Sequence, residues 1–248
     1  MGSRQEQGAC GRVLCGGLLA LLALTGAAVA FGAEAPVNRD PFVAVNRPIH
    51  DFNQVLDRHL VRPVAESYER VVPDPVERMV LNFFSNLIGP ARITGAFLQA
   101  DVDRTLIAGT RFAVNSTVGV AGLFDPATPM GLPDQQEDIG QALEVWGLEN
   151  SPYIVLPFLG PATLVQIPDR ALSIWLPQQL LGGYYTPAVG ALDIVSFRAS
   201  LLATSSIVDD SSLDTYTFTR DAFLQRRRFL RYNGELPAED WSDFLDDF

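Results

Sequence analysis

Few side chains in this sequence are of the types that perform catalysis or bind metals. Its only histidines are His50 and His59, which are nine residues apart and would lie on opposite faces of a straight helix, so a shared metal is not expected. The sequence contains no nucleophile elbow, no phosphate-binding glycine loop and no H-E-x-x-H zinc motif. Carboxylate pairs such as Asp101 and Asp103 are typical of helix caps and loops. We therefore expect neither enzymatic activity nor a metal or cofactor.

Arginine and asparagine recur instead within apolar segments. All 18 basic residues are arginine, and each can form two parallel hydrogen bonds with a phosphate or a carboxylate. The segment from Pro75 to Asp125 is apolar throughout, but its arginines leave no run of the roughly 20 apolar residues that a membrane-spanning helix needs. An apolar face studded with arginine suits a membrane interface or the wall of an amphipathic cavity. An ordinary soluble helical core with arginines at its rim is the alternative.

Length and composition limit the classes of protein that the chain can represent. Its 248 residues suffice for one large domain or two small ones, and 48% of them are hydrophobic. The net charge of -11 provides no basic field for binding nucleic-acid phosphates. The two cysteines, Cys10 and Cys15, lie near the N-terminus. Lipidation of Cys15 is not expected, because Leu14 occupies the place of a small residue and the apolar run follows the cysteine instead of preceding it.

Residues 1–30 have the features of a signal peptide. A weakly basic start precedes a Leu- and Ala-rich run, and Ala28-Val29-Ala30 and Ala33-Glu34-Ala35 are candidate cleavage sites. We expect export with cleavage near residue 30 to 35, which would leave a mature chain without cysteine. An uncleaved anchor is the alternative, since residues 13–33 carry no charge.

The remaining sequence predicts a series of short amphipathic helices. A capping residue or a glycine followed by proline marks helix starts at Asp40-Pro41, Asp74-Pro75 and Gly89-Pro90, and Asp101 offers a further cap. Pro48 predicts a break or a new first turn in the first helix. Later helices are expected over residues 64–72, 141–148, 169–181 and 188–204, and from Ser211 or Ser212 to Tyr232.

Two stretches differ from this helical pattern. Residues 153–168 place β-branched and aromatic residues on both sides of a Gly160-Pro161 turn, which predicts a hairpin or paired extended segments. Residues 234–248 form an acidic tail that we expect to be disordered, with Trp241 and Phe244 as docking points.

Five arginines crowd the second half of the last predicted helix, before the tail. Cations at a helix C-terminus match the helix dipole. Contact with lipid phosphates or with an acidic partner is the second interpretation.

Nine short motifs follow one another along the chain. They are D-P-F-x-x-x-N-R (40–47), F-N-x-x-L-D (52–57), R-P (62–63), N-F-x-x-N-L-x-x-P (82–90), F-L-Q-x-D (97–101), R-F-x-x-N-S (111–116), G-x-x-G-x-x-D (119–125), E-D-x-G-Q (137–141) and Y-x-x-L-P-x-x-G (153–160). Their order resembles that of the MlaA (VacJ) family of Gram-negative outer-membrane phospholipid-transport proteins. The resemblance runs in register from Asp40 to about Leu164, with weaker agreement to Arg231.

This resemblance implies a mainly α protein with a ring-like arrangement of short amphipathic helices around a central channel, and one small hairpin-like segment. A single domain would cover residues 36–233 on the periplasmic side of the outer membrane. Mislocalised phospholipids would leave the outer leaflet through the channel and pass to a periplasmic, MlaC-like carrier. A trimeric porin would be the membrane partner, and an inner-membrane ABC transporter would complete the route. Many relatives are lipoproteins, from which this chain departs, and the acidic tail is not part of the family pattern.

A lipid path needs an apolar wall for the acyl chains and a polar strip for the headgroup. We expect the path to be lined by Asn46, Arg47, Phe52, Asn53, Asn86, Arg111, Asn115, Gly119 and Gly122, and gated by Tyr153, Leu156, Pro157, Gly160 and Pro161. The alternative for each asparagine is a helix cap or an interhelical hydrogen bond, and for the two glycines a tight helix contact. At the level of function, the alternatives are a soluble periplasmic lipid carrier and a structural scaffold that braces a porin.

Overall fold

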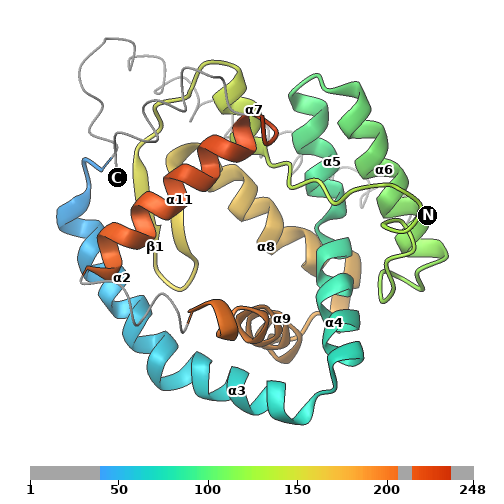
Figure 1. The fold of residues 1–248 in the computed structure, drawn as a ribbon, viewed down its shortest axis with the longest axis horizontal. Coiled ribbons are helices and arrows are strands. Elements are labelled where there is room, and N and C mark those ends of the chain that lie inside the picture. Colours follow the sequence, from blue (N-terminus) through green and yellow to red (C-terminus); the bar gives the residue numbers. More distant parts are fainter. Residues whose placement is uncertain (1–39, 206–213, 236–248) are drawn as a thin grey trace, which may run out of the picture. The chain divides into compact units, whose positions relative to one another are not determined.

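Helices account for most of the chain that the computed structural model describes, which is residues 40–205 and 214–235 (Figure 1). All of these residues belong to one of the two units into which tertiary contacts divide the chain, residues 39–248. Two short strands interrupt the helices in this part of the chain. The predicted fold class, mainly α with one small hairpin, is confirmed. The predicted signal peptide and the acidic tail from residue 236 onward lie outside the described residues.

The first part of the fold is a helical rod that runs from residue 43 to residue 71. It consists of α2 (Val43–Leu56), the π-helical turn η1 (Asp57–Val61) and α3 (Arg62–Val71). The break predicted at Pro48 is wrong, because α2 continues through this proline. Proline removes the hydrogen-bond donor for the carbonyl group of Ala44, but that residue is exposed near the helix start, where water can replace the donor.

Two further features of the rod differ from expectation or add to it. Asp40 does not cap α2, whose N-cap is Phe42. At the other end of α2, the π-helical turn begins at Asp57, and both oxygens of this carboxylate accept hydrogen bonds from Arg198 of α9, at 2.8 and 3.0 Å. This ion pair ties α9 (Pro187–Ser200) to the rod.

Three helices follow the rod: α4 (Asp74–Leu87), α5 (Gly89–Leu98) and α6 (Val102–Thr117). Pro75 and Pro90 occupy first turns, where the missing N–H group has no intrahelical partner. Asp101 is the N-cap of α6, as predicted, and accepts a hydrogen bond from the backbone N–H of Arg104 at 2.9 Å. Asp74, which the sequence predicts as a cap, is instead the first residue of α4. There its negative charge interacts favourably with the positive end of the helix dipole.

The predicted hairpin consists of β1 (Tyr153–Leu156) and β2 (Gly160–Thr163), which pair antiparallel with Leu156 opposite Gly160. The turn lies at residues 157–159 and not at Gly160-Pro161, so the predicted turn position is wrong. Phe158 and Gly160 have φ angles of 66° and 76°. Glycine adopts this left-handed conformation without steric cost, and Gly160 therefore closes the loop from the first position of β2.

The remaining elements are helical. They are α7 (Ile139–Val145), the 3-10 turn η2 (Leu164–Gln166), α8 (Ile167–Leu181), the 3-10 turn η3 (Gly182–Tyr184), α9 and α11 (Thr215–Arg231). Helix α8 continues through Pro177, as predicted. Helix α11 begins later than predicted, after its N-cap Asp214, and it ends at the predicted C-cap, where Asn233 and Gly234 have φ angles of 55° and 87°.

Most arginines in the second half of α11 bond to polar or acidic groups of the same unit. Arg227 is buried and forms ion pairs with Asp138 and, at 2.9 Å, with Glu144. Arg231 pairs with Glu149 at 3.2 Å. These bonds tie α11 to α7 and its flanking residues, which neither interpretation of the arginines anticipates.

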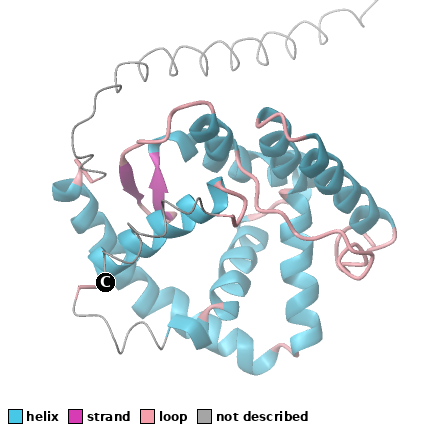
Figure 2. Ribbon diagram, turned by 45° about the horizontal axis from the view of Figure 1, so that its top comes forward, coloured by secondary structure: helices cyan, strands magenta, loops and turns pink. Residues whose placement is uncertain are grey.

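The hydrophobic core lies where the hairpin meets α2 and α11. Its buried residues are Tyr153, Val155 and Tyr216, and the rings of Tyr153 and Tyr216 pack edge to face with centroids 6.3 Å apart. In Figure 1 the ribbons of this unit follow a closed circuit, as the ring-like arrangement predicts, with α2 at the left beside the hairpin and α11, α3 at the bottom, α4 at the right and α7 at the top. The two strands are the magenta arrows next to α11 in Figure 2.

Candidate functional site

The residues predicted to line a lipid path fall into two groups. Asn46, Arg47, Phe52 and Asn53 lie on α2, and we call them, together with the hairpin, the hairpin cluster. Asn86, Arg111 and Asn115 line a pocket formed by α4, α5, α6 and the segment after α6, which we call the α4–α6 pocket. Figure 1 shows α2 and α6 on opposite sides of the unit, so the predicted residues fall into two separate groups, and whether both line one lipid path stays a prediction.

In the hairpin cluster, two asparagines of α2 hold the outer edge of β1. Asn46 donates to the carbonyl of Tyr153 at 3.1 Å and accepts from the N–H of Val155 at 2.9 Å. Asn53, two helical turns later, donates to the carbonyl of Leu156 at 3.0 Å and accepts from the N–H of Phe158 at 2.9 Å. Each amide thus satisfies two backbone groups that a neighbouring strand would otherwise pair. The alternative for each asparagine was a helix cap or an interhelical hydrogen bond. Both asparagines instead form hydrogen bonds from a helix to the hairpin.

Asp40 lies at the buried end of the hairpin cluster and is 5% exposed. Its carboxylate accepts hydrogen bonds from the hydroxyl of Tyr216 at 2.5 Å and from Asn46 at 2.9 Å, and Arg220 lies 3.5 Å away. Burial and, after it, the hydrogen bond to Asp40 raise the pKa of Tyr216. Burial and the charge of Asp40 raise the pKa of Tyr153 to about 12. Both phenols therefore stay protonated at neutral pH, and the cluster holds α2 and α11 together.

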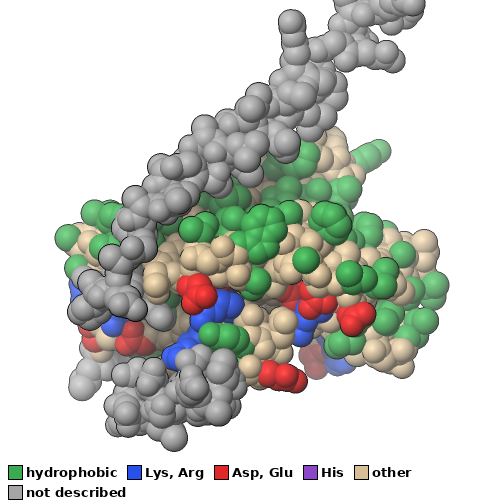
Figure 3. All heavy atoms as spheres, turned by 90° about the horizontal axis from the view of Figure 1, so that it is seen from above, with side chains coloured by type: hydrophobic (Ala, Val, Ile, Leu, Met, Phe, Trp, Pro, Cys, Tyr) green, Lys and Arg blue, Asp and Glu red, His purple; other side chains and the backbone are tan. Residues whose placement is uncertain are grey.

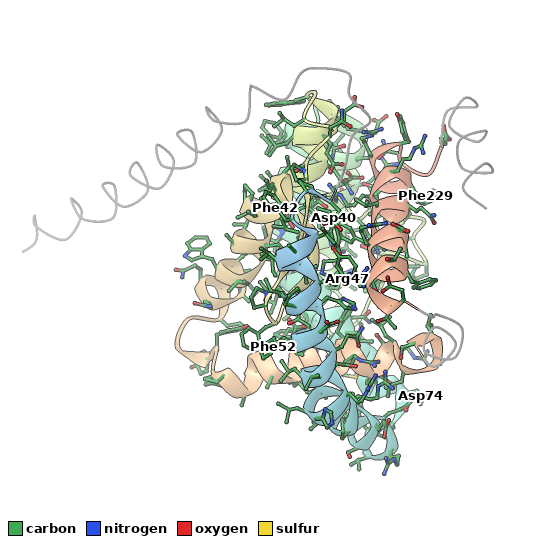
Figure 4. All side chains as sticks on the ribbon, turned by 90° about the vertical axis from the view of Figure 1, so that its left-hand side faces the viewer. Asp40, Phe42, Arg47, Phe52, Asp74 and Phe229 are labelled. Carbon is green, nitrogen blue, oxygen red and sulfur yellow. The ribbon has the colours of Figure 1, made fainter. Side chains whose placement is uncertain are left out.

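Arg47 makes a second connection between α2 and α11. Its two terminal nitrogens donate to the two oxygens of Asp214, the N-cap of α11, at 2.9 and 3.2 Å, and its guanidinium lies 4.7 Å from the ring centroid of Tyr216. The hydrogen bond from Arg47 holds the pKa of Asp214 below its usual range. Figure 4 shows Arg47 on the side of α2 that faces α11, whereas Phe42 and Phe52 lie on the opposite side.

The predicted gating residues divide between a fixed base and an exposed tip. Tyr153 is fully buried at the base, and Leu156 and Pro161 lie in the paired strands. The tip lies between Pro157 and Gly160, where Phe158 is 72% exposed and packs edge to face on Phe52 with centroids 5.5 Å apart. Gating by the tip stays a prediction.

The α4–α6 pocket is half open and has a cavity volume of about 100 Å³. Its polar wall includes Asn82, Asn86, Arg92, Arg111, Asp125 and Asp134. Since one water molecule needs about 10–15 Å³ of such volume, the pocket holds on the order of seven water-sized groups.

An inner ion pair closes one end of this pocket. Arg111 bonds to Asp125 at 3.0 Å, and Asn115 donates to the same carboxylate at 2.9 Å. Burial acts to raise the pKa of Asp125, but hydrogen bonds from Thr128, Asn115 and Arg111 outweigh burial, so the pKa is lowered. Arg111 also donates to the carbonyl of Leu132. These bonds fasten the segment after α6 to the helix.

Gly119 and Gly122 allow a close approach of the chain to itself. A Cβ atom at residue 119 would lie 2.4 Å from the carbonyl oxygens of Asn115 and Phe124, and one at residue 122 would lie 2.4 Å from the Cβ of Asn86. The tight contact expected as the alternative accounts for both glycines. A bulky residue at Gly119 would therefore disturb the fold, and its effect on lipid flux would not identify a path.

The sequence and the fold of this chain match known proteins. The family model described as "MlaA lipoprotein" matches residues 38–230. The chain belongs to the MlaA family. It is 32% identical over 219 residues, 84% of this chain and 85% of the relative, to the intermembrane phospholipid transport system lipoprotein MlaA of Escherichia coli (strain K12). It is also 33% identical over 193 residues, 76% of each chain, to an uncharacterized protein of Rickettsia felis.

A solved structure described as "Structural basis for maintenance of bacterial outer membrane lipid asymmetry" matches with a TM-score of 0.67 and 32% identity, and the match covers 77% of this chain and 98% of that chain. The match to the MlaA family includes both groups of site residues, since it begins just before Asp40 and ends within α11. Residues 1–37 and 231–248 lie outside it.

Several residues of the two groups are absent from the sequence-based prediction. Asn82 and Arg92 belong to the α4–α6 pocket. Asn82 precedes Asn86 by four residues, a spacing that would have placed both on one face of α4. No comparable signal exists for Tyr216, because 176 residues separate it from its partner Asp40.

Proposed function

We propose that this protein transports phospholipids across the cell envelope. It would remove mislocalised phospholipids from the outer leaflet of the outer membrane through an amphipathic channel and pass them to a periplasmic carrier. The relatives from Escherichia coli and Shigella flexneri, both 32% identical to this chain, are named as lipoproteins of an intermembrane phospholipid transport system, and this supports the proposal.

The observation that carries the proposal is a large set of exposed hydrophobic side chains. They come from α2, the hairpin tip, α5, α8 and α9, and include Phe52 (48% exposed), Phe97 (69%), Phe158 (72%), Trp175 (50%) and Phe197 (60%). In Figure 3 hydrophobic side chains gather along the upper edge of the view, and charged side chains lie along the lower edge. An apolar surface of this extent is typical of a membrane contact.

Attachment to the membrane is proposed to use this surface. Among residues 40–205 and 214–235, no helix has the length and apolar character that crossing a membrane requires. We place the protein at the periplasmic side of the outer membrane, with its exposed apolar residues in the interface. Lipidation is not included in this proposal, although the named relatives are lipoproteins.

A shielded path explains why a cell needs such a protein. Because each buried methylene group contributes roughly 0.8 kcal/mol, moving two acyl chains of about sixteen carbons each into water costs on the order of 20 kcal/mol or more. Surrounding the chains with apolar side chains lowers this cost. No bond is broken during this transfer, so the proposed function needs no enzymatic step and no cofactor.

The proposed partners are those that the resemblance to the family implies. A trimeric porin would hold the protein in the outer membrane, an MlaC-like carrier would take the lipid, and an inner-membrane ABC transporter would act on that carrier. Two other functions would also use an apolar surface without chemistry. A soluble periplasmic carrier would enclose lipid but stay in the soluble fraction, and a scaffold for a porin would carry no phospholipid.

The full chain, expressed in a Gram-negative host and purified from membranes in detergent, tests the proposal. Mass spectrometry of the preparation identifies retained phospholipid and the mature N-terminus together. We expect the purified protein to carry bound phospholipid and to need detergent for its extraction from membranes. Cells that lack the gene should have more phospholipid in the outer leaflet of the outer membrane. Recovery in the soluble fraction would favour the carrier function, and a membrane-bound protein free of lipid would favour the scaffold.

A further inference from the structure

The open side of the α4–α6 pocket carries an ion pair with unused hydrogen-bonding capacity. Arg92 of α5 donates from Nη1 to Oδ1 of Asp134 at 2.6 Å. Among the described residues, Nη1 is the one nitrogen of this guanidinium that has a hydrogen-bond partner, and Oδ2 of Asp134 has none. The side chains of Arg92 and Asp134 are 20% and 42% exposed. Both groups are therefore accessible from the pocket mouth.

The inner ion pair of the same pocket differs in this respect. Asp125 accepts hydrogen bonds on both oxygens, from Asn115 and the N–H of Thr128 on Oδ1 and from Arg111 and the hydroxyl of Thr128 on Oδ2. Both oxygens of Asp125 are therefore used to hold the segment after α6. The outer pair, Arg92 with Asp134, fastens fewer groups, although Oδ1 of Asp134 also lies 3.9 Å from Nε of Arg111, which links the two pairs.

Two amide side chains of the pocket also have hydrogen-bonding atoms with a weak partner or none among the described residues. The amide nitrogen of Asn82 makes one long contact, at 3.5 Å, with the carbonyl of Leu123. The side-chain oxygen of Gln135 is buried and has no hydrogen-bond partner among the described residues. Buried polar atoms are nearly always hydrogen-bonded in native proteins, so an unpartnered one next to a pocket indicates a missing donor. Donors at Arg92 and Asn82 and an acceptor at Asp134 thus line one small space, and the buried oxygen of Gln135 lies in a residue of the same wall.

We propose that the α4–α6 pocket binds the zwitterionic headgroup of a phospholipid, with a phosphodiester beside Arg92 and an ammonium group beside Asp134. The charged residues of the pocket are two arginines and two aspartates, which cancel. A lone anion drawn to Arg92 is repelled by Asp134 at almost the same distance. A zwitterion that lies antiparallel to the ion pair is attracted by both charges.

The segment that closes the pocket favours a lipid over a free phosphate compound. Val118, Val120, Phe124 and Met130 are 70%, 56%, 51% and 64% exposed in this segment, and Phe124 directly precedes Asp125 of the pocket wall. Acyl chains can lie along these side chains while the headgroup occupies the polar pocket. The inference rests on the proposed function, because it names the headgroup class that the transported lipid would carry.

Lipid selectivity tests the inference. The full chain is reconstituted with equimolar phosphatidylethanolamine and phosphatidylglycerol, and the lipid retained after purification is measured by mass spectrometry. We expect about fivefold enrichment of phosphatidylethanolamine, a ratio within reach of one charge-assisted contact. Asp134→Asn removes the charge that selects the ammonium group, so the enrichment disappears. Arg92→Gln removes the phosphate contact, so retention of both lipids falls.

The ion pair between Arg70 and Glu66 on α3 provides matched controls, since it lies outside the pocket. Arg70→Gln and Glu66→Gln each remove one charge and should leave the lipid ratio unchanged. Asn82→Leu fills the pocket without changing charge and should abolish the enrichment. Circular dichroism of each variant separates a binding effect from a loss of fold.

The outcomes of this experiment are distinguishable. A wild-type chain that retains no lipid overturns the proposed function and this inference with it. A wild-type chain that retains both lipids equally, or an Asp134→Asn variant that keeps the enrichment, overturns the inference and leaves lipid transport intact. Water-soluble glycerophosphoethanolamine and inorganic phosphate are the competing probes. If inorganic phosphate displaces lipid as well as glycerophosphoethanolamine does, the pocket is an anion site and the zwitterion is excluded.

Discussion

Asn46 and Asn53 show how two side chains of one helix replace a neighbouring strand. Asn46 is buried and makes three hydrogen bonds, whereas Asn53 is half-buried and makes two. Asn46→Ala leaves two buried backbone groups of β1 without partners and removes one of the hydrogen bonds to Asp40, so we expect it to lower the free energy of unfolding by about 2–3 kcal/mol. Asn53→Ala should cost about 1 kcal/mol. Denaturant unfolding measures both values.

Hydrogen exchange shows which part of the structure each substitution destabilises. The amides of Val155 and Phe158 should lose protection in Asn46→Ala and Asn53→Ala respectively. Gln54→Ala is the control, because the side chain of Gln54 makes no hydrogen bond among the described residues. Equal destabilisation in all three variants would show that the asparagines do not hold the hairpin.

A comparison of Gly122 with Gly131 separates the energetic cost of backbone strain from the cost of close packing. Their φ angles are similar, 89° and 83°, but a Cβ atom at residue 122 would lie 2.4 Å from the Cβ of Asn86, whereas one at residue 131 would meet nothing within 4 Å. Gly131→Ala should cost about 1 kcal/mol, from the unfavourable backbone conformation alone. Gly122→Ala should cost at least about 2 kcal/mol more, because the new methyl group displaces α4. Similar melting temperatures for the two variants would contradict the close approach.

The residues of the site were predictable to different degrees. Asn46, Asn53, Asn86 and Asn115 were identified because polar side chains stand out in apolar helices. Their partners were not predictable, since the bond from Asn46 to β1 joins residues 109 apart in the sequence. Which of these amides hold the fold and which face a pocket depends on tertiary packing, and a local pattern carries no information about it.

Two helix starts meet near α11 and bring carboxylates together. Asp138 is the N-cap of α7, Asp169 lies in the first turn of α8, and Arg227 of α11 pairs with Asp138. Burial and, after it, the charge of Asp138 raise the pKa of Asp169 from 3.8 to about 6, against the opposing effects of the hydrogen bond from the backbone N–H of Ile139 and of the charges of Arg170 and Arg227. The packing of these helices therefore places Asp169 where the charged form of its carboxyl group is unfavourable.

The pH dependence of this carboxylate has a definite sign. Because the pKa of Asp169 is higher in the folded chain, its contribution to stability is fully present below about pH 3.8 and is lost as the pH rises through about 6. Asp169→Asn should raise the free energy of unfolding by about 1–3 kcal/mol at pH 7.5, and the gain should shrink as the pH falls toward 4.

Urea unfolding at pH 7.5, 6 and 4.5 measures this gain. Asp103→Asn is the matched control, since Asp103 is an exposed carboxylate in the first turn of α6. A gain in stability that is the same at all three pH values would show that Asp169 is not the titrating group.

Element boundaries were predictable where the signal is local. Asp101 and Gly89-Pro90 were assigned correctly, because a cap or a proline in the first turn acts within one helical turn. Pro48 gave the wrong prediction, because the cost of a missing hydrogen bond depends on exposure, which the sequence does not specify. The pairing of Arg227 with Glu144, 83 residues away, is likewise set by packing between elements.

The distribution of side chains over the whole unit separates two surfaces. Phe42 and Phe52 lie on the side of α2 away from α11, and Phe229 lies on the α11 side (Figure 4). Charged residues such as Arg220, Asp221 and Arg226 belong to α11. If the proposed membrane contact is correct, a phenylalanine on the first surface contributes to membrane binding and one on the second does not.

Phe42 and Phe229 make this comparison nearly symmetrical, because they are 42% and 49% exposed. Phe42→Ser should weaken binding to phospholipid vesicles about tenfold, since about half of a phenylalanine side chain contributes about 1–1.5 kcal/mol when buried. Serine is also a favourable N-cap, so α2 keeps its start. Phe229→Ser removes the same side chain from the α11 surface and should leave vesicle flotation unchanged. If the two variants lose binding equally, the proposed orientation is wrong, and if Phe229→Ser loses more, the membrane lies against the α11 surface.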